Sequence, residues 1–298
     1  MDRAAFGHEQ ERRALAGAAG LALDGEIVRR GGLDWSPAIG FVGDLHCDAD
    51  GLEALLRRGR GLGITDWVLL GDLEYRPTHP ASQALLDRLP AIVEETGAQL
   101  RFIRGNHDEA DVLSVLADDA KEPVEVAPGL ELLPDGLVWE LHGLRLLVAG
   151  GARTIDASRG PEWSPNEAMS AATLARCMDA GEVDVVLAHD CPGEVPIARR
   201  HRRWRPGKDH RSKMSQLARS ARPRWWISGH YHERLSALIN LGQAPRCRVE
   251  ILDRSGTGDN SFFVATSDSL KRTGDDEQLT VRPGKTRPNV VMVAPSLV

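Results

Sequence analysis

Seven side chains of the kinds that bind metal ions lie in short motifs spread along the 298-residue chain. The motifs are GDLHCD at 43–48, GDLEY at 71–75, GNHDE at 105–109, AHD at 188–190 and GHYH at 229–232. They supply the carboxylate, amide and imidazole groups of Asp44, His46, Asp72, Asn106, His189, His230 and His232. Because a divalent ion takes about three or four protein ligands, some of them shared, this set is large enough for two metal ions.

Each motif follows a short apolar run, and such runs predict buried strands. The runs are AIGFV at 38–42, WVLL at 67–70, LRFI at 100–103, VDVVL at 183–187 and WWI at 225–227. Helical patterns at 52–58, 81–95, 110–117 and 168–178 alternate with them, which indicates α/β organisation. A hairpin is expected about His142-Gly143, and further strand-like runs at 235–239, 246–251 and 262–264 predict an added antiparallel part. The ligands are expected to converge at strand ends.

The five motifs, in this order and each behind a strand, resemble the calcineurin-like metallophosphoesterase superfamily. The resemblance extends from about Ile39 to about Val264. It implies an α/β fold of the α+β type, in which two stacked mixed β-sheets are flanked by helices as an αββα sandwich. On this interpretation residues 39–267 form the catalytic domain, residues 1–38 an N-terminal extension and residues 268–298 a C-terminal tail.

The resemblance also implies roles for the ligands. Asp72 falls where the family has the carboxylate shared by both ions, and two carboxylate oxygens can bind separate metals. The cofactors would be two divalent ions, with manganese expected first and iron or zinc as alternatives. They would lower the pKa of a bridging water and so supply hydroxide for direct attack on phosphorus. The implied ligands are Asp44, His46 and His232 for the first ion, and Asn106, His189 and His230 for the second.

His107 follows a proposed ligand and matches the family's histidine that does not bind metal. The resemblance implies that it acts as general acid, protonating the departing oxygen. Asp108 is expected to orient it. A neighbouring carboxylate raises the pKa of a histidine, so His107 is expected to be protonated near neutral pH.

The segment 198–213, ARRHRRWRPGKDHRSK, is the strongest feature outside the motifs. It concentrates arginine and lysine against a single aspartate, and guanidinium groups bind phosphate oxygens in pairs. We expect this basic arm to recruit a polyanionic partner such as a nucleotide, a nucleic acid or a phosphoprotein. The alternative is an exposed basic loop without a ligand, since charge runs are often only solvated. The candidate substrate-binding residues are Arg202, Arg203, Arg205 and, after the Gly151 turn, Arg153.

Composition excludes several other classes. A net charge of −6 with 42% hydrophobic residues is typical of a globular protein and argues against a surface that coats nucleic acid. No apolar stretch is long enough for a membrane span or a secretory signal, so a cytoplasmic protein without a membrane partner is expected. Cys47 and Cys191 lie beside proposed ligands, and we favour small buried hydrophobes over soft ligands or redox sensors. Trp225 and Trp226 are expected in the core rather than stacked on a ligand.

Two functions from different classes fit these motifs. The first is a metal-dependent phosphoesterase acting on a phosphomonoester or a phosphodiester. The second is a catalytically silent phosphate-binding or scaffold module on the same fold. Degenerate copies are expected to lose ligands or the acid, whereas all seven ligands and His107 are present here, which favours the enzyme. GDLEYR at 71–76 lacks the Asp-Arg-Gly string of the phosphoprotein phosphatase branch. The sequence defines neither the substrate nor the oligomeric state.

Overall fold

The computed structural model describes residues 37–117, 120–154, 166–198, 205–242 and 246–271. The predicted N-terminal extension and C-terminal tail therefore lie almost wholly outside the described residues. The helices and strands are, in chain order, β1 (Ala38–Val42), α2 (Ala49–Gly61), β2 (Asp66–Leu69), α3 (Pro80–Thr96), β3 (Gln99–Phe102), α4 (Ala110–Leu116), β4 (Val124–Ala127), β5 (Leu130–Leu132), β6 (Val138–Leu141), β7 (Leu144–Ala149), α5 (Ala171–Met178), β8 (Val185–Ala188), α7 (Arg205–Ala221), β9 (Trp225–Ser228), β10 (Leu235–Ile239), β11 (Cys247–Ile251), η1 (Gly258–Ser261), β12 (Phe262–Thr266) and α8 (Ser267–Lys271).

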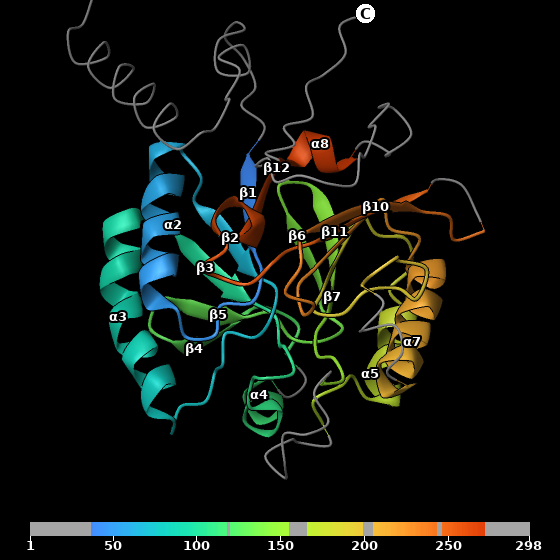
Figure 1. The fold of residues 1–298 in the computed structure, drawn as a ribbon, viewed down its shortest axis with the longest axis horizontal. Coiled ribbons are helices and arrows are strands. Elements are labelled where there is room, and N and C mark those ends of the chain that lie inside the picture. Colours follow the sequence, from blue (N-terminus) through green and yellow to red (C-terminus); the bar gives the residue numbers. More distant parts are fainter. Residues whose placement is uncertain (1–36, 118–119, 155–165, 199–204, 243–245, 272–298) are drawn as a thin grey trace, which may run out of the picture.

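These strands form two six-stranded mixed sheets (Figure 1). The first has the order β12-β1-β2-β3-β5-β4, and the second has the order β10-β11-β9-β8-β7-β6. The inner strands of each sheet run parallel, and an antiparallel strand closes each edge. The predicted hairpin is confirmed: β6 and β7 pair antiparallel, and His142 and Gly143 between them take φ values of 50° and 72°.

Alternating side chains explain why the parallel strands are apolar throughout. In β2, Trp67 and Leu69 pack against the helix side with α2 and α3, whereas Val68 and its neighbour Leu70 pack against the other sheet. Both faces of the strand are buried, as is usual for parallel sheets covered on both sides. Figure 1 shows α2 and α3 outside the first sheet and α5 and α7 outside the second. The predicted sandwich of two stacked sheets between helices is confirmed.

Local signals at the helix ends agree with the sequence. Asp48 caps α2 by accepting a hydrogen bond from the backbone N–H of Gly51, and Ser170 caps α5 through the N–H of Thr173. Pro80 occupies the first turn of α3, and Gly97 ends it with a left-handed φ of 67°. None of the described helices is long and apolar enough to cross a membrane.

The basic arm is not a continuous loop, because its second half, from Arg205 onward, is the first part of α7. The cause is an apolar face that a count of charges does not reveal. Met214, Leu217, Ala218 and Ala221 recur at helical spacing and are all fully buried. The alternative of an exposed loop therefore does not hold for the part of the arm from Arg205 onward, which is helical.

The five motifs all begin within three residues of the carboxyl end of a parallel strand. They follow β1, β2 and β3 in the first sheet and β8 and β9 in the second. Loops at the carboxyl ends of parallel strands share one edge of a sheet. The two stacked sheets bring both sets of loops together.

Candidate metal centre

The motif loops hold an unusual concentration of left-handed backbone conformations. Among the described residues other than glycine, eight have positive φ, and six of these lie in the motifs. The six are His46, Cys47, Asp72, Glu74, His230 and His232. Such conformations cost free energy for residues with a side chain and persist only where the surroundings enforce them. The backbone thus aims these side chains at a common space.

The glycines before the ligands allow the loops to approach each other closely. A Cβ at Gly105 would lie 2.1 Å from both the backbone N and the Oδ1 of Asp72. A Cβ at Gly71, whose φ is 94°, would lie 2.4 Å from the Nδ1 of His189. Gly105 is therefore required by a contact between two loops of the first sheet, and Gly71 by a contact between loops of the two sheets.

The first ligand cluster contains Asp44, His46 and His232, whose donor atoms lie within 4.8 Å of one another. The His232 Nε2 is 2.9 Å from Asp44 Oδ2 and 3.0 Å from His46 Nε2. The other oxygen, Asp44 Oδ1, accepts the backbone N–H of His230 at 2.8 Å. Asp44 thereby links the loop after β1 to the loop after β9 while its Oδ2 remains directed at the two imidazoles.

The second ligand cluster contains Asp72, His189 and His230, again within 4.8 Å. Asn106 joins it, since its Oδ1 is 3.0 Å from the Nε2 of His189. The Nδ1 of His189 donates to the backbone carbonyl of Leu70 at 2.6 Å, so its Nε2 is the nitrogen that faces the other ligands. A hydrogen bond of this kind is the usual device that orients a metal-binding histidine.

Asp72 lies between the two clusters. Its Oδ1 is 3.3 Å from His189 Nε2, and its backbone carbonyl accepts the N–H groups of Leu45 and His46 at 3.1 and 2.9 Å. Burial would raise the pKa of Asp72, but the charges of His189 and other nearby histidines outweigh it and lower that pKa. The structure brings all seven predicted ligands into these two adjacent groups.

When no cation is bound, buried histidines compensate the negative charge of the buried carboxylates. Burial lowers the pKa of His189, but Asp72 and Asp44 raise it more strongly, to about 10. The pKa of His230 falls to about 4, because of burial and the neighbouring charge of His189. One proton thus occupies the second cluster at neutral pH, in a place where a cation would replace it.

The donor set fits a pair of divalent ions. Asp44 Oδ2 is buried, and its near neighbours are imidazole nitrogens, with His232 Nε2 at 2.9 Å, so a cation between these groups would balance the charge of the buried carboxylate. The 3.0 Å between the Nε2 atoms of His46 and His232 is close to the roughly 3.0–3.4 Å that separates two ligands of one ion. Imidazole, carboxylate and amide donors suit manganese, iron or zinc.

Glu74 is a site residue that sequence reasoning missed. Its Oε1 accepts a hydrogen bond from His46 Nδ1 at 3.1 Å and lies 3.8 Å from His107 Nδ1. This bond leaves His46 Nε2 facing Asp44 and His232. Glu74 thus has the position of a carboxylate that orients a metal-binding histidine. The only sequence signal was an acidic residue two positions after Asp72, inside the GDLEY motif.

His107 lies at the edge of the site, with its Nε2 3.9 Å from Asp72 Oδ2 and its ring in edge contact with that of His46. The expected direction of its pKa shift is wrong. Burial lowers the pKa of His107, and although Asp72 and Glu74 raise it, the nearby charges of His46 and His189 oppose them. In the absence of ligands, His107 is therefore mainly neutral at pH 7.

The Asp108 carboxylate is occupied by backbone groups. Its Oδ2 accepts the N–H of Gly105 at 2.6 Å and that of Asp72 at 3.1 Å, and its Oδ1 accepts the N–H of Tyr75 at 2.8 Å. Burial and the charge of Asp72 nevertheless raise the pKa of Asp108 to about 6. These contacts join the second and third motif loops, a role different from the predicted orientation of His107.

Two further supporting networks were not foreseen. Thr154 Oγ1 donates to Glu167 Oε2 at 2.6 Å and so accepts from Asn106 Nδ2 at 3.2 Å, which turns the amide oxygen toward His189. On the other side, Asp190 accepts hydrogen bonds from His210 Nδ1 at 2.7 Å and from the Tyr231 hydroxyl. Burial opposes ionisation, yet His210 lowers the pKa of Asp190 to about 2.

A cavity of about 500 Å³ opens beside the first cluster. His46, His107 and His232 line it together with Arg254 and Ser255 from the loop after β11. The Arg254 side chain is exposed, and it makes no ion pair with any residue that the structure describes. The cavity therefore has an available cation opposite the histidines.

Of the predicted substrate-binding residues, only Arg153 has a described side chain. It is partly exposed and lies 3.4 Å from Glu167 Oε1. Arg202 and Arg203 lie outside the described residues, and Arg205 is the first residue of α7, with only its backbone described. Trp225, Trp226 and Cys191 are buried in the core as expected, and burial together with Glu74 raises the pKa of the half-buried Cys47 thiol to about 12.

Comparison with known proteins identifies a family. A sequence model of the calcineurin-like phosphoesterases matches residues 37–234, which include all five motifs. No curated protein matches the chain.

Three of the solved structures that this chain resembles are as follows. A protein of Thermus thermophilus is 14% identical over 75% of this chain and 92% of its own, with a TM-score of 0.45. A dimetal phosphatase from Danio rerio is 14% identical over 74% of this chain and 88% of its own, with a TM-score of 0.48. A further chain, 12% identical over 78% of this chain and 95% of its own, reaches a TM-score of 0.51 and supports the fold alone.

Proposed function

The chain belongs to the calcineurin-like phosphoesterase family, and on this premise we propose that it hydrolyses phosphate esters with two divalent metal ions. One observation carries the proposal. Seven metal-binding side chains from both sheets converge in two adjacent groups, and a histidine outside these groups, His107, lies at their edge.

In this proposal each ligand group holds one ion, and Asp72 is shared between them. Manganese is the ion to load first, with iron and zinc as alternatives, because imidazole and oxygen donors suit all three. When bound, the ions supply the activation of water and the neutralisation of phosphate charge. The ligands of the first ion are Asp44, His46 and His232, and those of the second are Asn106, His189 and His230.

The remaining groups act on the substrate. Arg254 lines the cavity beside the first cluster and would bind a phosphate oxygen, since a guanidinium forms charge-assisted hydrogen bonds with phosphate. His107 faces the same cavity and would give its proton to the departing oxygen. Its lowered pKa limits the protonated form in the free protein, whereas an arriving phosphate anion favours that form.

The substrate class follows from the same features. A phosphorylated small molecule such as a nucleotide, or a phosphate on a nucleic acid or phosphoprotein, would meet cations at this cavity. The location proposed for the protein is the cytoplasm.

Hydrolysis of p-nitrophenyl phosphate and of bis(p-nitrophenyl) phosphate by the manganese-loaded protein tests the proposal. Asp72→Asn should abolish both bound metal and turnover, and Asp50→Asn, which changes a carboxylate exposed at the surface, should alter neither. Preference for the diester indicates a phosphodiesterase, and preference for the monoester indicates a phosphatase. Metal binding without hydrolysis of either compound would contradict the proposed hydrolytic activity and favour the catalytically silent phosphate-binding module.

A further inference from the structure

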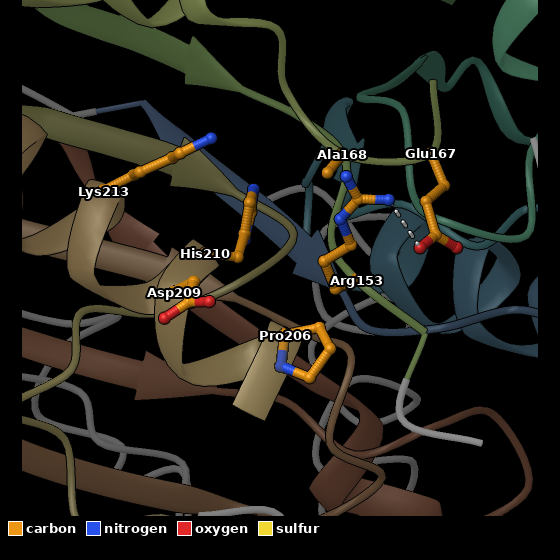
Figure 2. Close-up of a pocket in the computed structure, with 7 residues that line it drawn as sticks. All are labelled: Arg153, Glu167, Ala168, Pro206, Asp209, His210 and Lys213. Atoms are coloured by element: carbon orange, nitrogen blue, oxygen red, sulfur yellow. Dashed lines mark hydrogen bonds and ion pairs between the residues drawn. The ribbon is translucent and has the colours of Figure 1, made fainter. Parts of the chain in front are cut away.

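A second cavity of about 500 Å³ is lined by residues of α7 and of the chain between β7 and α5. Figure 2 shows its lining, in which His210, Asp209 and Lys213 come from the first turns of α7, opposite Arg153 and Glu167. None of these residues is a proposed metal ligand. The cavity therefore needs a separate explanation.

The second cavity is connected to the second ligand cluster along two routes. Arg153 precedes Thr154, whose hydroxyl accepts the amide N–H of the ligand Asn106 at 3.2 Å. His210 donates to Asp190 at 2.7 Å, and Asp190 directly follows the ligand His189. A molecule whose phosphate lies at the metal centre would thus have this cavity beside it.

His210 gives the second cavity an unsatisfied polar group. The residue is only 3% exposed, and its Nε2 is buried without a hydrogen-bond partner among the described residues. Its ring cannot turn to satisfy that nitrogen, because Nδ1 is held by the Asp190 carboxylate. In Figure 2 the ring projects from α7 between Lys213 and Arg153. A buried polar nitrogen held in this way indicates that a bound molecule supplies its hydrogen-bond partner.

Two cations, Lys213 and Arg153, and two carboxylates, Asp209 and Glu167, line the second cavity. Lys213 forms no ion pair within the described parts of the chain, whereas Arg153 contacts Glu167 at 3.4 Å. The Glu167 carboxylate also accepts hydrogen bonds from the hydroxyl and the N–H of Thr154. Asp209 is exposed. Lys213 is thus the cation that an anionic ligand could bind without breaking a described ion pair.

A phosphate group can satisfy these residues. Lysine and arginine both bind its oxygens. Because Nδ1 of His210 is held by Asp190, Nε2 is the nitrogen left for a ligand, and it can form a hydrogen bond with a phosphate group.

We propose that the second cavity is a subsite for a second phosphate group of the substrate. The inference deepens the proposed function and rests on it, because it places one phosphate at the metal ions and another beside Arg153, His210 and Lys213. The substrate is then a compound with two phosphate groups, rather than a simple monoester.

Calorimetric titration of the manganese-loaded protein with propane-, butane- and pentane-bisphosphonates, each compared with propylphosphonate, tests the subsite. The bisphosphonate of matching length should bind at least about tenfold more tightly than the monophosphonate, since a hydrogen bond to a charged group contributes roughly this factor or more. Lys213→Gln and Arg153→Gln should remove that advantage. Lys208→Gln, which removes an exposed cation on the same helix outside the cavity, should keep it.

The proposal is overturned if no bisphosphonate binds better than the monophosphonate, or if the advantage survives Lys213→Gln. An equal loss in Lys208→Gln would also overturn it, because the effect would then come from the general charge of α7. Binding is measured without turnover, so failure of the proposed function remains distinguishable. If p-nitrophenyl phosphate is hydrolysed but no bisphosphonate binds more tightly than the monophosphonate, only the proposed subsite is contradicted. If a bisphosphonate binds more tightly but nothing is hydrolysed, only the proposed enzymatic activity is contradicted.

Discussion

The hydroxyl of Thr154 lies 3.2 Å from the Nδ2 of Asn106 and determines which end of that amide faces the metal centre. Glu167 fixes the direction of the contact, because the Thr154 proton is donated to its carboxylate. The Asn106 oxygen is thereby left toward His189. Thr154, a neutral residue between an acid and the amide, thus decides whether the amide offers an oxygen or a nitrogen to a cation.

Thr154→Val should weaken binding at the second ion by about 10- to 100-fold, the usual effect of losing a partner that orients a ligand. Valine keeps the shape and removes the hydroxyl, so the amide is no longer held. Competition with a chelator measures the affinity. Thr154→Ser retains the hydroxyl and should retain the affinity, and equal losses in both variants would contradict the orienting role.

His107→Gln should lower kcat by about 100-fold or more while the bound metal stays unchanged. The reason is that His107 faces the cavity but belongs to neither ligand cluster of the proposal. Elemental analysis of the purified variant beside a turnover assay gives both quantities. Loss of both ions would show instead that His107 is a ligand.

Asp108→Asn should destabilise the protein by about 1–3 kcal/mol and reduce metal binding with it. The carboxylate accepts three backbone N–H groups with its two oxygens, whereas an amide must turn its NH₂ toward at least one of them. Thermal unfolding of the metal-free protein measures the effect. Glu109→Gln, a matched change next along the chain, should have little effect, and an Asp108→Asn variant of normal stability would favour direct action on His107.

The affinity for manganese should rise with pH between about 6.5 and 10, by up to about tenfold per unit for one displaced proton. Asp72 and Asp44 raise the pKa of His189 from 6.5 to about 10 against the effect of burial, so a cation must displace that proton. Because the pKa of His189 is higher in the folded protein, its protonation also stabilises the metal-free fold. This contribution is complete below about pH 6.5 and is lost as the pH approaches 10.

Chelator competition at pH 6.5, 7.5 and 8.5 measures this slope. His142→Asn changes another histidine paired with a carboxylate, Asp66, far from the ligands in the chain, and should keep the slope. A flat profile in the unmodified protein would contradict the protonated state of His189.

The sequence predicted the parts of the site that depend on local pattern. A polar residue shortly after an apolar strand is a local arrangement, so the seven candidate ligands that the fold brings together could be named from the motifs. The orienting groups Glu74, Thr154 and His210 could not, because each contacts its partner across a gap that only the tertiary fold closes. The direction of the pKa shift of His107 was misjudged for the same reason. Asp108 is next to His107 in sequence, but burial dominates the pKa of His107.

The hydrogen bond between Asp44 Oδ1 and the N–H of His230 joins residues 186 positions apart. Contacts of such high sequence separation form late, because the loop-closure entropy must be overcome first. During synthesis the chain emerges from its N-terminus, so strands β1 to β5 precede the loop after β9 that carries His230 and His232. In the proposed centre, the complete ligand set of the first ion therefore exists only after most of the chain has left the ribosome.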